Sequence, residues 1–228
     1  MACLQQGAKC WASARSQNNF EAFTSTVPEH LRPNLRLRKV DSASKEESAA
    51  LLEEILALDV QINHVVSSMG GWQEHGMLSD VSVEAFKAAI GDMSMPHFIC
   101  YSTFAKVLAQ TPGSTYTFVT GGSAQDNKPF PVRFASASML APTTALIYGM
   151  YSSAECENRE NVNLEINQLR IHFFIRPRMD SEFDEKNSEF EVGKDFIGRF
   201  FPKVMNVKRG GLTVLENRTQ ANATFESY

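Results

Sequence analysis

The sequence predicts an α/β fold built around a mostly parallel sheet. Segments with helical periodicity alternate with short β-branched segments along the 228 residues, and this alternation is typical of parallel strands joined by crossover helices. The apolar content of 43% and the charged content of 21% are ordinary for a globular protein. We therefore expect one domain over residues 1–228, with residues 1–15 irregular or a strand remnant and residues 218–228 a loose tail.

The first third of the chain supplies three of the predicted strands. Residues 8–15 fit a short strand, and residues 17–26 fit a helix. The segment Leu35–Val40 alternates as a strand does, and Ser44–Glu47 is a capping box that starts a helix. The β-branched segment Val60–Val66 is followed by a Ser- and Gly-rich stretch, which predicts a buried strand that ends in a tight loop.

The rest of the chain continues the same alternation. A long helix is predicted over about residues 83–110, and Pro96 should kink it because proline has no N–H to donate. The later predicted elements are a strand over 115–120, a helix over 131–157, a strand over 169–175, a helix over 193–205 and a last strand over 210–215.

Charge and cysteine usage exclude several classes of protein. The net charge of -4 and the pI near 5.8 argue against a broad nucleic-acid surface. The four cysteines form no C-x-x-C pair, and no Cys/His cluster has metal-ligand spacing. No apolar stretch is long enough to span a bilayer, and no secretory signal is visible. We therefore expect a soluble, cytoplasmic protein without a metal, a nucleic-acid partner or a membrane span.

Several local motifs occur in an order that resembles one known family. They are Val40-Asp41, the segment Asn63–Gly71, the strand Tyr116–Gly121, the segment Phe134–Ser138, the strand Ile171–Pro177 and Gly210-Gly211. From about residue 10 to residue 217, this order resembles the short-chain dehydrogenase/reductase family. The resemblance implies a Rossmann-like, doubly wound α/β sheet flanked by helices, and NAD(P)-dependent oxidoreductase chemistry.

The family's catalytic positions hold different residues in this chain. The resemblance implies a tyrosine acid, a lysine one helical turn later, a serine that holds the substrate and an asparagine on the long helix. Those positions are occupied here by Phe134, Ser138, Gly121 and Met93. A phenyl ring has no proton to give, and a serine carries no charge that would lower the pKa of a phenol.

A search for the pair elsewhere needs no alignment. Four residues after Tyr101, Tyr116, Tyr148 and Tyr151 come Ala, Thr, Ser and Glu, and the fifth tyrosine, Tyr228, ends the sequence. The chain therefore contains no Tyr-x-x-x-Lys, and we assign it no catalytic residues.

The cofactor site also departs from the family pattern. Neither G-x-x-x-G-x-G nor G-x-G-x-x-G occurs, so the glycine-rich turn that cradles a pyrophosphate is missing. Any NADP binding should therefore be weak. The resemblance implies that six residues could still line a dinucleotide: Arg15, Ser16, Asp41, Ser67, Met69 and Gly70.

Each of these candidates has a structural alternative. Arg15 and Ser16 can hold a 2′-phosphate or simply end a strand in polar residues. Asp41 can contact an adenine or initiate the next helix. The loop Ser67–Gly70 can line a ribose or only terminate a buried strand. His64 and His97 lie on buried faces, where a histidine of the core or of an interface is the default expectation.

The resemblance also concerns the start of the chain. By register, the chain begins near the family's second strand, so we expect an N-terminally truncated and divergent member, whether natural or the product of a truncated gene model. The family's first strand lies between its second and fourth strands. We therefore expect residues 8–15 to take the second place, with a gap or a shifted pairing beside the Val60–Val66 strand.

Three functional hypotheses follow. The favoured one is a non-catalytic scaffold, a subunit or a weak NAD(P)-binding protein. The alternatives are an oxidoreductase with non-standard residues and a fragment of a longer gene product. In the family the two long helices form a dimer interface, so residues 83–110 and 131–157 are expected to mediate homo-oligomerisation or assembly into a complex.

Overall fold

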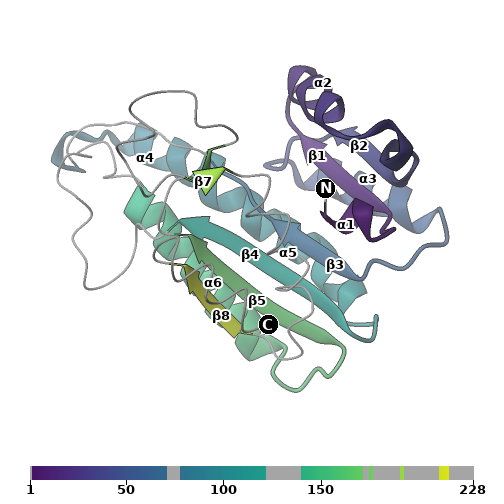
Figure 1. The fold of residues 1–228 in the computed structure, drawn as a ribbon. Helices are drawn as coiled ribbons and strands as arrows, with labels where there is room; N and C mark the ends of the chain where they lie inside the picture. The colour runs from purple at the N-terminus through teal and green to yellow at the C-terminus, as the bar shows by residue number, and fades with distance from the viewer. Residues whose placement is uncertain are drawn as a thin grey trace.

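Helices and strands alternate along the chain (Figure 1). This computed structural model describes residues 2–70, 78–121, 140–171, 175–176, 191–192 and 211–215. The helices are α1 (Ala2–Gln5), α2 (Gln17–Thr26), α3 (Lys45–Leu56), α4 (Val83–Ala89), α5 (Met95–Leu108) and α6 (Leu140–Glu157), with 3-10 turns η1 (Glu29–Asn34) and η2 (Leu78–Asp80) and a π-helical segment η3 (Ile90–Ser94). The strands are β1 (Cys10–Ala14), β2 (Leu35–Lys39), β3 (His64–Ser67), β4 (Ser114–Gly121), β5 (Leu164–Ile171), β6 (Ile175–Arg176), β7 (Glu191–Val192) and β8 (Gly211–Leu215).

The described strands are parallel and form a four-stranded sheet and two two-stranded sheets. The large sheet has the order β3-β4-β5-β8, and β1 pairs only with β2. A doubly wound sheet has the order 3-2-1-4-5-6. In that order β2, β1 and β3 occupy the third, second and fourth places. The expected Rossmann-like fold is therefore confirmed, and so is the gap between the second and fourth places.

The exposure of the strands shows that β3 is an edge strand. In a doubly wound fold the central strands are covered on both faces and are almost wholly apolar. Strand β4 is covered on both faces, since six of its eight residues are buried, although four of those six are Ser or Thr. In β3, by contrast, Val66 is 37% exposed and only Ser67 is buried.

One hydrophobic core joins the large sheet to three helices on the same face. Tyr116 and Phe118 of β4 pack there against Phe104 of α5 and Ile147 of α6. Ile55 of α3 belongs to the same cluster, and Trp11 of β1 packs against it. The β1-β2 pair is therefore attached to the rest of the molecule by side-chain packing across the gap.

The capping box at Ser44 is confirmed in part. The Ser44 hydroxyl accepts a hydrogen bond from the Glu47 N–H at 3.2 Å, which satisfies one free donor of the first turn of α3. The Glu47 carboxylate does not return to Ser44. It accepts from the Asp41 N–H at 2.6 Å and so fastens the preceding turn to the helix.

Two predicted strands differ in extent from the observed ones. The strand expected at Val60–Val66 is shorter and occupies His64–Ser67, although Val60 and Ile62 still pack on the core. The strand expected from residue 169 begins at Leu164, before the polar residues that hid its start. Residues 193–205, where a helix is expected, and the tail 218–228 lie outside the described residues.

The single long helix expected over 83–110 is interrupted by the π-helical segment η3, directly before Pro96. Pro96 lacks the N–H that would bond to the Asp92 carbonyl, so the α-helical ladder cannot pass through this point unchanged. π-helical turns inside helices occur frequently at functional sites. The helix type therefore changes just before Pro96, and the expected kink itself stays a prediction.

Candidate functional site

The carboxyl ends of the parallel strands define the candidate site. Ligands of open α/β sheets bind outside this edge, where the strand order reverses. Arg15 and Ser16 directly follow β1, the loop Ser67–Gly70 begins at the last residue of β3, and Gly121 is the last residue of β4. The structure therefore places these predicted residues at one edge of the sheet system.

The loop after β3 is held by a buried histidine of α5. The Ser67 hydroxyl lies 2.8 Å from Nδ1 of His97, and Nε2 of His97 lies 3.1 Å from the Met69 carbonyl oxygen. Ser67 is 1% exposed and His97 is 0% exposed. Burial lowers the pKa of His97 to about 4, opposed by the bond to Met69. The imidazole is therefore neutral at physiological pH.

The same loop rests on the π-helical segment. Gly70 has a φ of 110°, in the region that favours glycine. A Cβ added to Gly70 would lie 3.8 Å from the Cα of Met93, so backbone strain rather than space fixes this position as glycine. Met93, to which the resemblance assigns the family's asparagine position, packs here as an apolar side chain that is 6% exposed.

The π-helical segment η3 also connects two other elements at this edge. The Arg15 guanidinium lies 4.0 Å from the Asp92 carboxylate, which joins the end of β1 to η3. The Ser94 hydroxyl donates to the Thr143 carbonyl at 3.0 Å, and the Thr143 hydroxyl donates to the Met93 sulfur at 3.7 Å, which joins η3 to α6. The segment η3 therefore contacts both the end of β1 and α6 at the candidate site.

Asp41 lies at the helix-initiating turn of α3. Its side-chain oxygen accepts from the Ala43 N–H at 3.0 Å, and its carbonyl accepts from the Ser44 N–H at 2.8 Å. This geometry supports the structural interpretation of Asp41, because the carboxylate already performs the work of a turn residue.

A phenol and a guanidinium meet at the end of β4. The Tyr148 hydroxyl of α6 donates to the Gly121 carbonyl at 2.9 Å. The Arg170 guanidinium of β5 lies 3.5 Å from the centroid of the Tyr148 ring, and the Gln168 side-chain oxygen accepts from Arg170 at 3.1 and 2.9 Å. The resemblance assigns the family's serine position to Gly121, and the Tyr148–Arg170 pair lies beside this residue. The other two family positions, Phe134 and Ser138, fall outside the described residues.

Sequence reasoning did not find Asp92, Tyr148 or Arg170. Asp92 carries the signal of a carboxylate just before an interior proline, where a helix is expected to change its hydrogen bonding. Tyr148 and Arg170 are far apart in sequence and share no motif, so only the fold brings them together. His97 was expected to be a core histidine, and its 0% exposure confirms that expectation.

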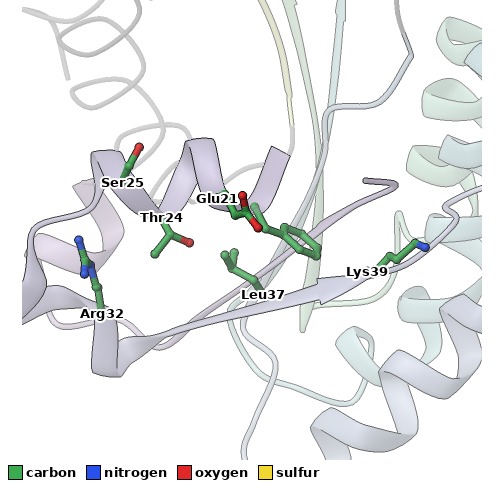
Figure 2. Close-up of a pocket in the computed structure, with 7 residues that line it drawn as sticks. Glu21, Thr24, Ser25, Arg32, Leu37 and Lys39 are labelled. Carbon is green, nitrogen blue, oxygen red and sulfur yellow. The ribbon is translucent and has the colours of Figure 1, made fainter. Parts of the chain in front are cut away.

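A separate pocket of about 590 Å³ lies between α2 and β2 (Figure 2). Arg32 and Lys39 lie at its two ends, and Glu21 and Leu37 face each other between them. None of the predicted site residues lines this pocket. Its size is within the range of small-molecule sites, but it is distinct from the edge around η3.

The described residues contain neither a membrane-spanning helix nor a metal-binding cluster. No helix there has the length and apolarity needed to cross a membrane. In the same part of the chain, no group of three or more His, Cys, Asp or Glu side chains is arranged to hold a metal ion.

Known proteins with similar sequence or fold agree on one family. No family model matches the sequence. Short-chain dehydrogenase/reductase iacG of Pestalotiopsis fici is 30% identical over 132 residues, which span 57% of this chain and 48% of that protein. The match thus spans about half the length of this curated relative.

Two solved structures share the fold. A short chain dehydrogenase from Bacillus anthracis has a TM-score of 0.75 at 12% identity, over 93% of this chain and 86% of that one. A tyrosine-to-phenylalanine variant of ElxO with NADPH bound has a TM-score of 0.71 at 11% identity, over 92% of this chain and 88% of that one. Over 132 residues the chain is thus similar in sequence to one short-chain dehydrogenase/reductase, and it shares its Rossmann-like fold with solved members of that family.

Proposed function

We propose that the protein binds a nicotinamide dinucleotide weakly at the η3 edge and does not use the family's proton-transfer chemistry. The observation that carries this proposal is the lack of a Tyr-x-x-x-Lys pair anywhere in the sequence. Family chemistry needs a phenol whose pKa is lowered by a nearby ammonium. Without that pair, cofactor binding is the part of the family's function that this chain retains.

The buried phenols support the non-catalytic half of the proposal. Burial, followed by the Glu157 carboxylate, raises the pKa of Tyr101 to about 12. Burial also raises the pKa of Tyr116 well above its ordinary value, and Tyr116 is 0% exposed. Both phenols therefore hold their protons more tightly than a free tyrosine does.

The residues at the η3 edge fit a dinucleotide in part. A 2′-phosphate would take Arg15 from Asp92, and a ribose would lie on the loop Ser67–Gly70. The given sequence holds neither G-x-x-x-G-x-G nor G-x-G-x-x-G to supply N–H groups to a pyrophosphate, so we expect this chain to bind the dinucleotide with low affinity. NADPH is present in the ElxO variant that has phenylalanine in place of a tyrosine. In that protein, at least, cofactor binding survives the loss of a tyrosine hydroxyl.

Fluorescence titration with NADPH and NADH tests the binding half. We expect NADPH to bind more tightly than NADH and expect Arg15→Ala to abolish this preference. The matched control is Arg36→Ala, which removes an arginine of β2 whose guanidinium lies 5.8 Å from the Trp11 ring. Absence of NADPH binding at millimolar concentration would refute the binding half. Reduction of a carbonyl panel above background would refute the non-catalytic half.

One observation favours a second candidate, a carbonyl reductase with an unusual acid. Tyr148 lies beside the serine position, with the Arg170 guanidinium over its ring. A bound reduced nicotinamide would supply the hydride. Tyr148 would donate its phenolic proton to the substrate carbonyl oxygen, Arg170 would stabilise the resulting phenolate, and water would return the proton.

This candidate is tested by Tyr148→Phe, which keeps the ring under Arg170 and removes only the hydroxyl. Turnover should fall by about a hundredfold or more, which is the usual contribution of a general acid. Tyr151→Phe, one helical turn away on α6, is the matched control and should retain activity. A wild-type chain without turnover removes the candidate.

Self-association is proposed through α5 and α6. Met95 and Phe98 of α5 are 40% and 50% exposed, and Leu146 of α6 is 43% exposed. Large apolar side chains exposed on the helices that mediate dimerisation in the family support a homo-oligomer. Phe98→Lys should convert it to monomers in sedimentation experiments. Val162→Lys, at a loop position that is 93% exposed, should have no effect.

A further inference from the structure

Both ring nitrogens of His97 bind the loop that follows β3. Nδ1 meets the Ser67 hydroxyl at 2.8 Å, and Nε2 meets the Met69 carbonyl oxygen at 3.1 Å. The ring itself is fixed, because it is fully buried and stacks on Phe118 of β4 with centroids 6.3 Å apart. One rigid ring on α5 therefore determines the positions of two points of the loop.

The chemistry of the partners fixes the tautomer of His97. A carbonyl oxygen only accepts hydrogen bonds, so Nε2 must carry the proton that reaches Met69. Burial lowers the pKa of the ring to about 4, so Nδ1 is unprotonated and accepts from the Ser67 hydroxyl. Hydrogen bonds are therefore donated in one direction, from the Ser67 hydroxyl to Nδ1 and from Nε2 to the Met69 carbonyl oxygen.

The bond to Met69 also affects the neighbouring residue. Gly70 follows directly, with a φ of 110°, and a Cβ added to it would lie 3.8 Å from the Cα of Met93. A left-handed glycine persists in one conformation only when its surroundings hold it. The hydrogen bond to the Met69 carbonyl and the nearby backbone of Met93 supply that constraint on Gly70.

We infer that His97 is a positioning residue that holds the loop Ser67–Gly70 in the shape that a bound dinucleotide contacts. The inference rests on the proposed function for its ligand. The two hydrogen bonds that join His97 to Ser67 and Met69, called the clamp below, are a property of the chain alone. His97 does not touch the ligand. It acts through Met69, whose carbonyl oxygen accepts a hydrogen bond from the ring on α5.

Two substitutions divide the clamp into halves. Glutamine places an amide nitrogen close to the position of Nε2, so His97→Gln keeps a donor for Met69. Asparagine places an amide close to the position of Nδ1, so His97→Asn keeps only a partner for Ser67. His97→Leu removes both. His64→Gln is the control, because His64 is a histidine of β3 that the structure exposes, contrary to the expectation of a buried face, and its Nδ1 lies 3.1 Å from the Thr115 hydroxyl.

The first test needs no ligand. Nitrogen-15 NMR of the purified chain should show one histidine locked in the Nε2–H form down to about pH 5, since its pKa is about 4. Hydrogen exchange should accelerate at residues 68–70 in His97→Asn and His97→Leu but stay near wild type in His97→Gln and His64→Gln. Equal exchange at residues 68–70 in all variants would overturn the clamp.

The second test measures NADPH affinity by fluorescence in the same variants. We expect about tenfold weaker binding in His97→Asn and His97→Leu, the equivalent of one lost hydrogen bond. His97→Gln should stay within about threefold of wild type. A purely structural histidine would give affinity losses that follow the loss of thermal stability in every variant, including His97→Gln, and that result would overturn the inference. If wild type binds no NADPH while the exchange pattern holds, the proposed function fails and the clamp stands.

Discussion

The two sides of the candidate site are built in opposite ways. On the β3 side, Ser67, Met69 and His97 form a buried network with bonds of 2.8 and 3.1 Å. On the β1 side, Arg15 and Asp92 meet at 4.0 Å with side chains 53% and 51% exposed. Buried hydrogen bonds are costly to break, whereas exposed ion pairs contribute little. The β3 side is thus preorganised, and the β1 side can exchange its partner for an anion.

The largest expected effect is on the buried side. His97→Leu leaves the Ser67 hydroxyl and the Met69 carbonyl without their partners, and each such loss costs about 1–3 kcal/mol. We expect the free energy of unfolding in urea to fall by about 3 kcal/mol or more. A loss below about 1 kcal/mol would mean that the network relaxes or admits water.

Acid should weaken the same side next. The unfolded chain protonates His97 near its ordinary pKa of 6.5, whereas the folded chain does so only near 4. The unfolded state therefore binds more protons in this window, so stability is lost as the pH falls from 6.5 to 4, by about 3 kcal/mol.

Neighbouring groups do not offset this charge. Cys100 and Tyr116, which lie beside the histidine, have pKa values raised by burial and stay neutral in acid. Denaturation at several pH values should show a shallower pH dependence in His97→Gln than in wild type. Identical slopes would contradict the assignment.

A medium effect is expected at the cap of α3, the helix whose Ile55 belongs to the core cluster on which Trp11 of β1 packs. Ser44→Ala removes the acceptor of the Glu47 N–H and should cost about 1 kcal/mol in chemical denaturation. Ser44→Asp restores an acceptor at a helix N-terminus and should recover most of the loss. Failure of Ser44→Asp to recover it would show that the Glu47–Asp41 bond holds this turn alone.

The smallest effect on stability is expected at the exposed pair. Asp92→Asn should change the free energy of unfolding by less than about 0.5 kcal/mol, because the pair is half-exposed. Its effect should appear in binding instead. With the competing carboxylate removed, Arg15 should hold NADPH several-fold more tightly at low salt. An unchanged affinity would show that Arg15 does not receive the phosphate.

The order of elements could be predicted from sequence because it depends on local periodicity. Helix α2 occupies Gln17–Thr26 as expected, and the Ser44 cap follows from a four-residue pattern. The π-helical segment could not be predicted. Pro96 indicates that the α-helical hydrogen bonding is interrupted, but it does not determine which helix type results. The contacts of Arg15 with Asp92 and of Tyr148 with Arg170 depend on how distant elements pack, which one sequence does not encode locally.

The candidate site was predicted unevenly for the same reason. The loop Ser67–Gly70 was recognised by its motif, but the partner that shapes it, His97, carried only the signal of a helical core position. Asp41 shows the opposite outcome. Its motif suggested a ligand contact, and the structure engages it in a turn. Motifs indicate a region for a ligand, whereas packing determines which side chains in that region are free to contact the ligand.

The gap between β1 and β3 has a consequence for how the molecule comes apart. Among the described residues, no backbone hydrogen bond crosses from β1 to β3, and the connection runs through side chains, namely the packing of Trp11 and Ile55 and the exposed Arg15–Asp92 ion pair. Regions joined only by side-chain packing open at lower free energy than regions joined by a sheet ladder. The amino-terminal βαβ unit should therefore detach as a cooperative block while β4 and β5 remain folded, giving two transitions on a denaturation curve instead of one.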